Sequence, residues 1–461
     1  MDQKLIPFAV LTALCAVSCS NEVVLEQNDD PKGNAIAFST KVGHSSRAAE
    51  TTIENLGDFD VIAKSVYNDG SLYNAYLIGS DAGGETAKRD GNTSTWNLDH
   101  NVYLPNSVRN VAFWAFTDQQ VGDTDSKVLS SGTVSFDSHN GPKISGYTSA
   151  TADLENEELS TWADGYAQHD LVTAFAQAKN DGVISNVIKL DFAHLLSQVK
   201  LNASQLGKAQ NDHRVVKVKG AWFVNVRQKA TLSAGYAYES GTDKISDKPS
   251  WGAWENPACF GTYYKDNIDL SSATTEKGED LLKTPLMLIP QDENLAAWDA
   301  KTENTTDTYI MLLCRVELKH PGDTHGAGTA SGDDIYAAEG YHYHQQFPVN
   351  AEGKYNANEY GLTCIPVKID WKSGYRYTYN LDICGAASGA GVYPPIAPED
   401  AQKLIPAGDA DIVLNTTRPS GKNIGDPVLD EPIKFNVSVS AWKEDSEWTN
   451  GSLLDSDSSK N

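Results

Sequence analysis

The first mature stretch of the chain alternates between apolar and polar positions. Within residues 35–48, Ile36, Phe38 and Thr40 share one side and the residues between them share the other. The period of two predicts a short strand. The strand gives way to a polar run that starts at Val42 and closes with Arg47 and Ala48.

A longer alternation occupies the other end of the chain. Between 433 and 442 the apolar side is formed by Ile433, Phe435, Val437, Val439 and Ala441, and the intervening side chains are Lys, Asn and Ser. A strand of this kind can complete its own sheet or add itself to the sheet of another molecule.

Between these ends lie many short runs rich in aromatic and β-branched residues, bounded by Gly, Asn, Asp or Ser. They occur at 59–67, 71–79, 94–103, 111–116, 132–136, 187–202, 215–226, 286–291, 309–318, 364–369 and 375–381. Residues 168–179 also fit a helical stripe, so their state stays open. The pattern predicts an all-β fold with two β-sandwich domains, 35–205 and 206–445, followed by an acidic tail at 446–461. The long segments 267–283, 320–335 and 385–432 are expected to be loops that are mobile or carry binding roles.

The first 34 residues have the features of an export signal. Lys4 precedes an apolar run from Leu5 to Val17, which is too short to span a bilayer. Small residues then lead to Cys19, which resembles the lipidated cysteine of a lipoprotein. We therefore expect a signal peptide at 1–18 and an acidic tether at 19–34; the alternative is an ordinary signal peptide with a chance cysteine.

Composition narrows the possible partners. The 461 residues include 62 acidic and 37 basic side chains, giving a net charge of −25. Nucleic acids and anionic membrane surfaces would repel such a chain. The only membrane contact expected is therefore a lipid on Cys19.

The candidate chemistry is sparse. None of the nucleophile-elbow, P-loop or H-E-x-x-H patterns occurs, so no catalytic residue and no cofactor is predicted. His342 and His344 place two imidazoles on one strand face, but without a third ligand we expect a packed or solvated pair and no metal site. His194 is expected to be a structural histidine. The cysteines lack a C-x-x-C spacing: Cys314 and Cys364 read as buried thiols, and a disulfide among Cys259, Cys314, Cys364 and Cys384 stays open.

Several segments together resemble the fimbrillin family, the type V pilins of Bacteroidales. The segments, in chain order, are Leu56-Gly57-Asp58-Phe59-Asp60-Val61, Tyr103-Leu104-Pro105 followed by Phe113-Trp114-Ala115-Phe116, Gln168-His169-Asp170-Leu171, Leu190-Asp191-Phe192-Ala193-His194-Leu195, Ile289-Pro290-Gln291, Trp371-Lys372-Ser373-Gly374-Tyr375-Arg376-Tyr377 and Val437-Ser438-Val439-Ser440-Ala441-Trp442. The lipoprotein-like start and the Arg47-Ala48 step agree with the same resemblance.

The resemblance implies two transthyretin-like β-sandwich domains and export as a lipoprotein to the outer membrane and cell surface. It also implies that an Arg-specific protease cuts between Arg47 and Ala48. The first strand, with Ile36, Phe38 and Thr40, would then be displaced by a strand of another fimbrial subunit. The strand at 433–441 would be the donor.

Three classes of function follow. The first is a structural pilus subunit assembled by strand exchange, whose partners are other fimbrial subunits. The second is a tip or accessory adhesin that binds a host, microbial or glycan ligand through loops of the second domain. The third, an enzyme or glycan-binding lipoprotein, needs a polar cluster that the sequence does not single out. At about 1.5–3 kcal/mol per buried large side chain, the donor is expected to outbind the leader by roughly 3–6 kcal/mol.

Overall fold

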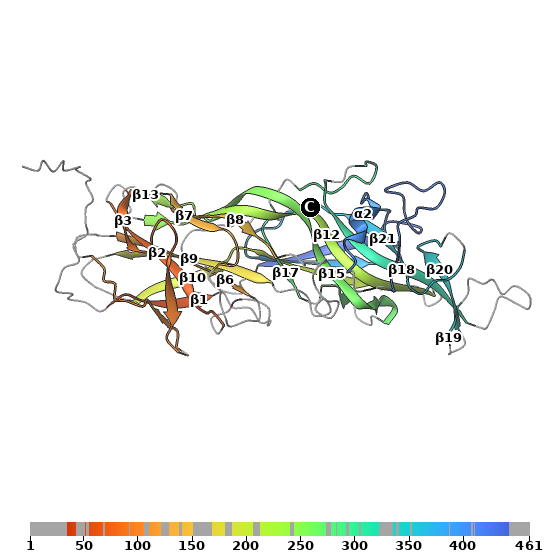
Figure 1. Cartoon of the computed structure of the whole chain (residues 1–461), viewed down its shortest axis with the longest axis horizontal. Helices are drawn as coiled ribbons and strands as arrows, with labels where there is room; N and C mark the ends of the chain where they lie inside the picture. The colour runs from red at the N-terminus through yellow and green to blue at the C-terminus, as the bar shows by residue number, and fades with distance from the viewer. Residues whose placement is uncertain are drawn as a thin grey trace, which may run out of the picture.

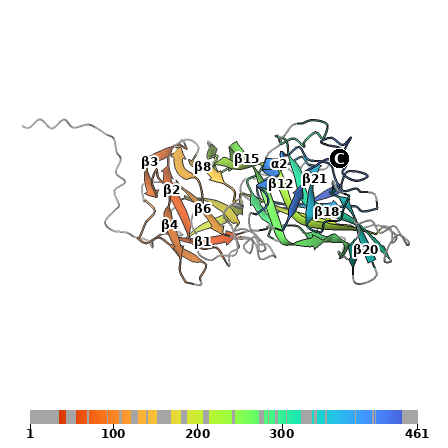
Figure 2. The same ribbon diagram turned by 45° about the vertical axis from the view of Figure 1, so that its right-hand side comes forward.

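The computed structural model describes most of the chain between residues 35 and 441. The described residues are 35–42, 51, 55–67, 70–91, 93–105, 110–120, 129–137, 141–150, 168–179, 187–205, 213–239, 244–272, 278–282, 284–291, 295–303, 306–321, 335–337, 341–350, 353–386, 388–406, 409 and 411–441. They form an elongated, almost entirely β molecule with a lobe at each end (Figures 1 and 2). The all-β prediction is confirmed.

The first lobe is a set of strands whose pairings run full circle. In sheet order they are β3 (Leu72–Ile78), β2 (Phe59–Val66), β4 (Glu85–Arg89), β5 (Thr95–Asn97), β1 (Ala37–Val42), β10 (Val187–His194), β9 (His169–Lys179) and β6 (Asn110–Gln120). A further pairing between β2 and β6 closes the ring. Its interior is an apolar cluster that includes Phe38, Phe59, Trp96 and Phe113.

The second lobe is a sandwich of two sheets. One sheet has the order β16 (Glu279–Asp280), β11 (Ser197–Ser204), β22 (Tyr375–Asp382) and β24 (Lys434–Ala441), with β17 (Leu286–Leu288) also on β11. The other contains β7 (Thr133–Asp137), β8 (Gly141–Thr148), β12 (Arg214–Ser233), β15 (Ser250–Asp269), β18 (Tyr309–Pro321), β19 (Ile335–Ala337), β20 (Tyr341–Phe347), β21 (Glu359–Pro366) and β23 (Val413–Asn415). The small elements are β13 (Ala237–Glu239), β14 (Lys244–Ser246), η1 (Leu270–Ser272) and α2 (Pro398–Gln402).

Strand β12 joins the lobes. Its 20 residues pair with β18 and β15 in the second lobe and, near its end, with β8, which packs beside the first lobe. A shared apolar cluster contains Trp114 and Phe116 of β6 together with Leu232 of β12 and Trp251 of β15. The long strands are visible in Figure 1 as the green ribbons that run between the lobes. Because both lobes contribute to one cluster, we expect them to unfold together.

The shared cluster explains the ambiguous segment 168–179. It is strand β9, which pairs with β6 along its whole length. Leu171 belongs to the shared cluster on one face and Val172 to the interior of the first lobe on the other. Apolar residues are therefore needed on both faces, which imitates a helical stripe.

Two further expectations need correction. Residues 385–432 do not form an open loop: Ala390, Val392 and Tyr393 are buried, α2 packs on the second lobe, and β23 pairs with β21. Strand β11 lies inside the range predicted for the first domain, yet it pairs with β22 of the second lobe.

The four described cysteines are free, and Cys314, Cys364 and Cys384 are buried, as expected for the first two. No helix in the described part of the chain has the length and apolar character needed to cross a bilayer.

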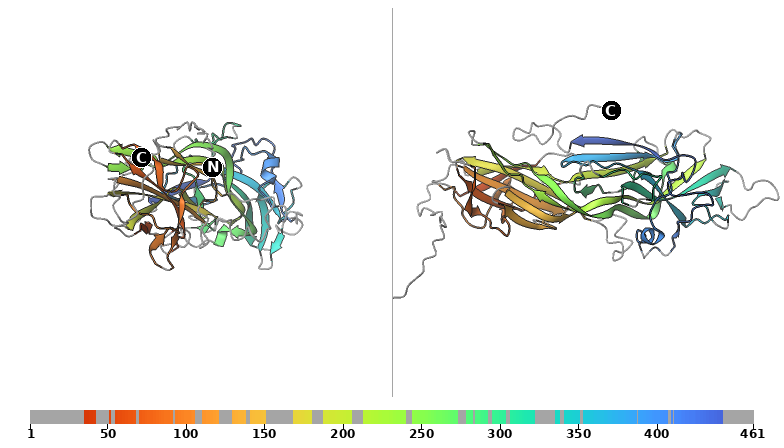
Figure 3. Two further views of the ribbon diagram at one scale, coloured as in Figure 1. Left: turned by 60° about the vertical axis from the view of Figure 1, so that its left-hand side comes forward. Right: turned by 90° about the horizontal axis from the view of Figure 1, so that it is seen from above.

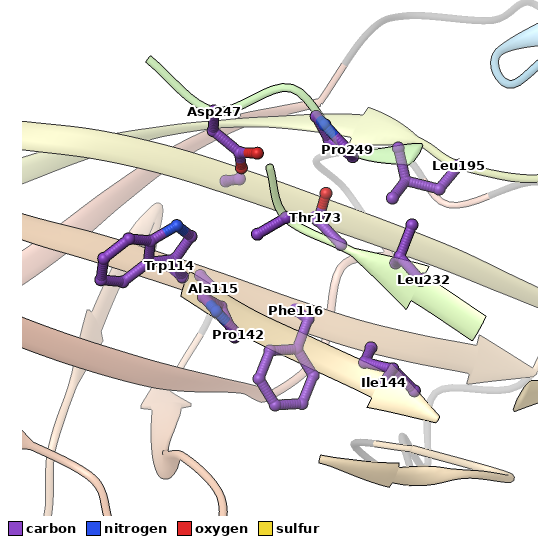
Figure 4. Close-up of a pocket in the computed structure, with 12 residues that line it drawn as sticks. Trp114, Ala115, Phe116, Pro142, Ile144, Thr173, Leu195, Leu232, Asp247 and Pro249 are labelled. Carbon is purple, nitrogen blue, oxygen red and sulfur yellow. The ribbon is translucent and has the colours of Figure 1, made fainter. Parts of the chain in front are cut away.

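A cavity of about 30 Å³ lies at the joint between the lobes. Figure 4 shows Asp247 and Pro249 above Trp114 and Thr173, all of which line the cavity. Trp114 Nε1 and Asp247 Oδ1 are buried without a hydrogen-bond partner among the described residues. Burial raises the pKa of Asp247 from 3.8 to about 8, because the ionised carboxylate is poorly solvated there.

This carboxyl predicts a specific pH dependence of stability. Because its pKa is higher in the folded state, Asp247 stabilises the fold fully below pH 3.8, and the contribution is lost as the pH rises toward 8. We expect a decline of about 1.4 kcal/mol per pH unit in this window. Asp247→Asn should remove that slope and raise the free energy of unfolding at pH 8, measured by urea denaturation. The exposed Asp90→Asn is the control; equal slopes in wild type and Asp247→Asn would contradict the prediction.

Candidate functional site

Strand β1 fills a slot between two other strands of the first lobe. It runs parallel to β10 from the pair Ala37–Val187 to the pair Val42–Phe192, and antiparallel to β5 through Phe38–Trp96 and Ser39–Thr95. The chain before it pairs once more, through Ile36 N to Val102 O at 2.8 Å. The first described segment is thus an internal strand of the sheet.

The inward side chains of β1 close the interior of the first lobe. Ile36 is 4%, Phe38 0% and Val42 1% exposed. The Phe38 ring makes edge-to-face contacts with Phe59 and Phe113 at centroid distances of 6.0 and 6.3 Å. Without these side chains, the rings of the interior would face water.

Val42 corrects the predicted end of this strand. The sequence pattern placed it in the polar run, but it continues the inward face of β1 and pairs with Phe192. The alternation Ile36, Phe38, Thr40, Val42 gave the signal, which the polar neighbours after Val42 concealed.

Thr40 is the weak position of β1. Its Oγ1 atom is buried and has no hydrogen-bond partner among the described residues. An unsatisfied buried hydroxyl costs about 1–3 kcal/mol. β1 therefore fits its slot well at three inward positions and poorly at one.

Strand β24 has the opposite character. It pairs with β22 from Lys434–Asp382 to Ala441–Tyr375 and is the end strand of its sheet (blue, outermost, in the right-hand view of Figure 3). Ile433 just before it is buried, but Phe435 is 38%, Val437 38% and Val439 55% exposed. These apolar side chains lie at the edge of the core and are only partly covered.

The contacts that hold β24 are modest. Phe435 packs on the ring of Tyr379 at 6.4 Å. On the other face an asparagine ladder crosses three strands: Asn202 donates to Asn380 at 3.0 Å, and Asn380 donates to Asn436 at 3.1 Å. Main-chain pairing, this ladder and the partial burial of the apolar side chains together attach β24 to its sheet.

The inward face of β1 is repeated along β24. The order Ile36, Phe38, Thr40, Val42 corresponds, at the same spacing, to Ile433, Phe435, Val437, Val439. The one difference replaces Thr40, whose hydroxyl is unsatisfied, by a valine. β24 therefore carries the side chains that suit the slot of β1.

A buried contact between His194 and Asp170 anchors the chain shortly after β1. His194 Nδ1 lies 2.9 Å from Asp170 Oδ2, and the Thr51 amide donates to the same oxygen at 2.9 Å. All three residues are buried. Burial raises the pKa of Asp170, but the His194 charge and the hydrogen bonds from His194 and Thr51 outweigh it, so that the pKa lies below its usual value. His194 is buried against Asp170, which also accepts the hydrogen bond from Thr51; sequence reasoning missed both of these residues.

Three predicted site residues, Cys19, Arg47 and Ala48, lie outside the described residues. What the structure adds is their setting. Arg47 and Ala48 belong to the connection between Val42, the last residue of β1, and Thr51, which Asp170 holds.

Comparison with known proteins gives distant likenesses. No protein-family model and no curated protein matches the chain. A fimbrial protein from Bacteroides vulgatus is similar in structure over 89% of this chain and 100% of its own, with 13% identity and a TM-score of 0.43. Two proteins provisionally named as cell adhesion proteins match as well. The one from Bacteroides eggerthii covers 90% of this chain and 98% of its own (9% identity, TM-score 0.37), and the one from Parabacteroides distasonis 90% and 99% (8%, 0.40). At these values the function has to be argued from the chain's own residues.

Thr40 gives a direct test of the fit of β1. Thr40→Val should raise the free energy of unfolding by about 1–2 kcal/mol, because a methyl group replaces an unsatisfied buried hydroxyl. Thr86 in the same lobe is the matched control: its hydroxyl donates to Asp60 at 2.7 Å, so Thr86→Val should lower the stability. Chemical denaturation measures both. Destabilisation by Thr40→Val would show that the hydroxyl is satisfied.

Proposed function

We propose that the chain is a structural subunit of a surface pilus, exported as a lipoprotein and assembled by donor-strand exchange after proteolysis. In this proposal β1 is a removable plug, and β24 of a neighbouring subunit takes its place. The observation that supports it most is the repeated pattern Ile-x-Phe-x-(Thr or Val)-x-Val. Its apolar side chains are buried in β1, whereas Phe435, Val437 and Val439 of β24 are partly exposed.

The number of large side chains that β1 and β24 can each bury in the slot explains why strand exchange would need proteolysis of the chain after β1. Our expectation of a 3–6 kcal/mol advantage for the donor was wrong on two counts. Val42 adds to the hold of β1, and Ile433 is already buried in its own lobe. Each strand then offers three large side chains to gain or lose: Ile36, Phe38 and Val42 against Phe435, Val437 and Val439.

Because the two strands would bury nearly the same number of large apolar side chains, β1 stays in the slot as long as the chain is uncut. It is tethered to the lobe, whereas a donor must also meet the cost of association, about 4–15 kcal/mol. Cleavage between Arg47 and Ala48 turns the plug into a separate peptide and removes that tether. Thr51, three residues after the new N-terminus, donates its amide hydrogen bond to Asp170, which also contacts His194.

The arrangement of the lobes favours an open chain of subunits. The slot belongs to the first lobe and β24 to the edge of the second (Figure 3). A slot at one lobe and a donor at the other give a head-to-tail contact, and such contacts produce filaments when they do not close. Other fimbrial subunits, of this or a related chain, are the proposed partners.

The proposal includes an Arg-specific protease as the processing enzyme and a lipid on Cys19 as the anchor at the outer membrane before assembly. A tip or accessory adhesin is the alternative. It finds less support, because residues 388–406, one of the segments expected to display a binding surface, contribute buried side chains to the second lobe.

Filament formation by the cut protein tests the proposal. Full-length protein treated with an Arg-specific protease should assemble, as seen by electron microscopy and size-exclusion chromatography, and Arg47→Lys should stay monomeric. Val437→Asp should abolish assembly after cutting, because it places a charge in an apolar slot. Ser438→Asp, on the opposite face of β24, is the matched control and should assemble.

Two outcomes would contradict the proposal. One is assembly of Arg47→Lys under the same treatment. The other is assembly of Val437→Asp at the rate of Ser438→Asp, which would mean that the apolar face of β24 does not enter the slot.

A further inference from the structure

Strands β18 and β20 pair in the second lobe, at the end far from β1 (Figure 1). Three histidines lie on one face of this strand pair. In the β18–β20 pair, His320 lies opposite His342, and Leu318 lies opposite His344. Paired residues of antiparallel strands share a face, and so do residues two apart on one strand. His320, His342 and His344 therefore lie side by side, which the sequence alone did not show because His320 is 22 residues from His342.

The spacing of the three rings is nearly equal. The centroid of His320 lies 5.3 Å from that of His342 and 5.2 Å from that of His344, and the last two are 5.1 Å apart. With Zn–N bonds of about 2.0–2.1 Å, the centroids of three imidazoles around one tetrahedral ion also lie about 5 Å apart. The cluster has the dimensions of a three-histidine metal site.

The nitrogens do not converge as the rings stand. His320 and His342 are nearly parallel, at 16°, and within the described ranges no three His, Cys, Asp or Glu side chains are placed to hold an ion in their present rotamers. Rotation of imidazole rings about χ2 meets only broad, shallow minima. An ion would therefore bind by turning rings whose positions the two strands already fix.

We propose that His320, His342 and His344 bind one divalent transition-metal ion of the zinc class, with water in the fourth position. Neutral imidazoles suit Zn²⁺, Cu²⁺ and Ni²⁺ rather than Ca²⁺ or Mg²⁺. The net charge of −25 raises the local concentration of cations. The ion would link β18 to β20 where this strand pair extends beyond the main core. The site is independent of the proposed strand exchange.

The residues that flank the histidines support a metal site on the histidine face of the β18–β20 pair and not on the opposite face. Lys319 lies over the ring of Tyr341 at 4.0 Å and over that of Tyr343 at 5.9 Å. Lys319, Tyr341 and Tyr343 alternate with the histidines along their strands, so they occupy the opposite face. The lysine charge is thus kept away from the imidazoles by the thickness of the sheet.

Titration of the full chain with Co²⁺ and then Zn²⁺ tests the site. We expect one saturable site with the visible absorption of Co²⁺ in nitrogen and oxygen ligands, displaced by Zn²⁺ and retained in excess Mg²⁺. Acidification below the usual histidine pKa of about 6.5 should release the ion. Zn²⁺ should also raise the midpoint of thermal unfolding.

The decisive variants are His320→Gln and His344→Gln, because both side chains are half-buried. His342 is only 2% exposed, so its replacement would also affect folding. Each should weaken Zn²⁺ binding by more than about 100-fold, beyond the loss typical of an outer-shell partner. The exposed His213→Gln is the matched control and should bind as wild type. No saturable site, an equal loss in His213→Gln, or a thiolate-to-Co²⁺ charge-transfer band from cysteine ligands would each overturn the proposal.

Discussion

The burial of Phe38 between Phe59 and Phe113 is the contact on which the first lobe depends. It places β1 inside a ring of paired strands, so that the lobe is closed only while this short segment stays in position. Main-chain pairing with β10 and β5 holds the segment, and three buried side chains seal the interior. One unsatisfied hydroxyl, on Thr40, works against it. The lobe is thus complete, and a short strand with one unsatisfied buried hydroxyl closes it.

In the second lobe, the edge strand β24 presents apolar side chains that its own lobe does not fully cover. β24 is the end strand of its sheet, and its apolar side chains remain partly exposed. An exposed apolar edge strand is ordinarily a hazard, because it invites pairing with other chains. Here its side chains repeat those of the plug at the same spacing. A partly exposed edge strand at one end and a slot filled by a short strand at the other are consistent with the proposed exchange, and the long strand β12 joins the two lobes.

Much of this could be predicted from alternation alone. The period of two identified β1 and β24, and Ile36, Phe38 and Ile433 proved buried as the pattern required. The alternation of apolar and polar residues did not predict three features. Val42 looked polar by its neighbours; β9 looked helical because both of its faces are covered; and His320 joins His342 and His344 only through strand pairing. Each depends on contacts between residues far apart in sequence, which local pattern does not encode. The buried segment 388–393 was missed for the same reason, since its Gly and Ser content is typical of loops.

Intermolecular cross-linking measures the central claim most directly. If Phe435 of one subunit replaces Phe38 of another, Asn436 takes the place of Ser39, which lies beside Lys189 in β10. A protein with both Asn436→Cys and Lys189→Cys should form a ladder of disulfide-linked oligomers after cleavage at Arg47 and remain monomeric before it. The same experiment with Ser440→Cys in place of Asn436→Cys should give no ladder. A ladder before cleavage, or one that is equally strong with Ser440→Cys, would contradict the account.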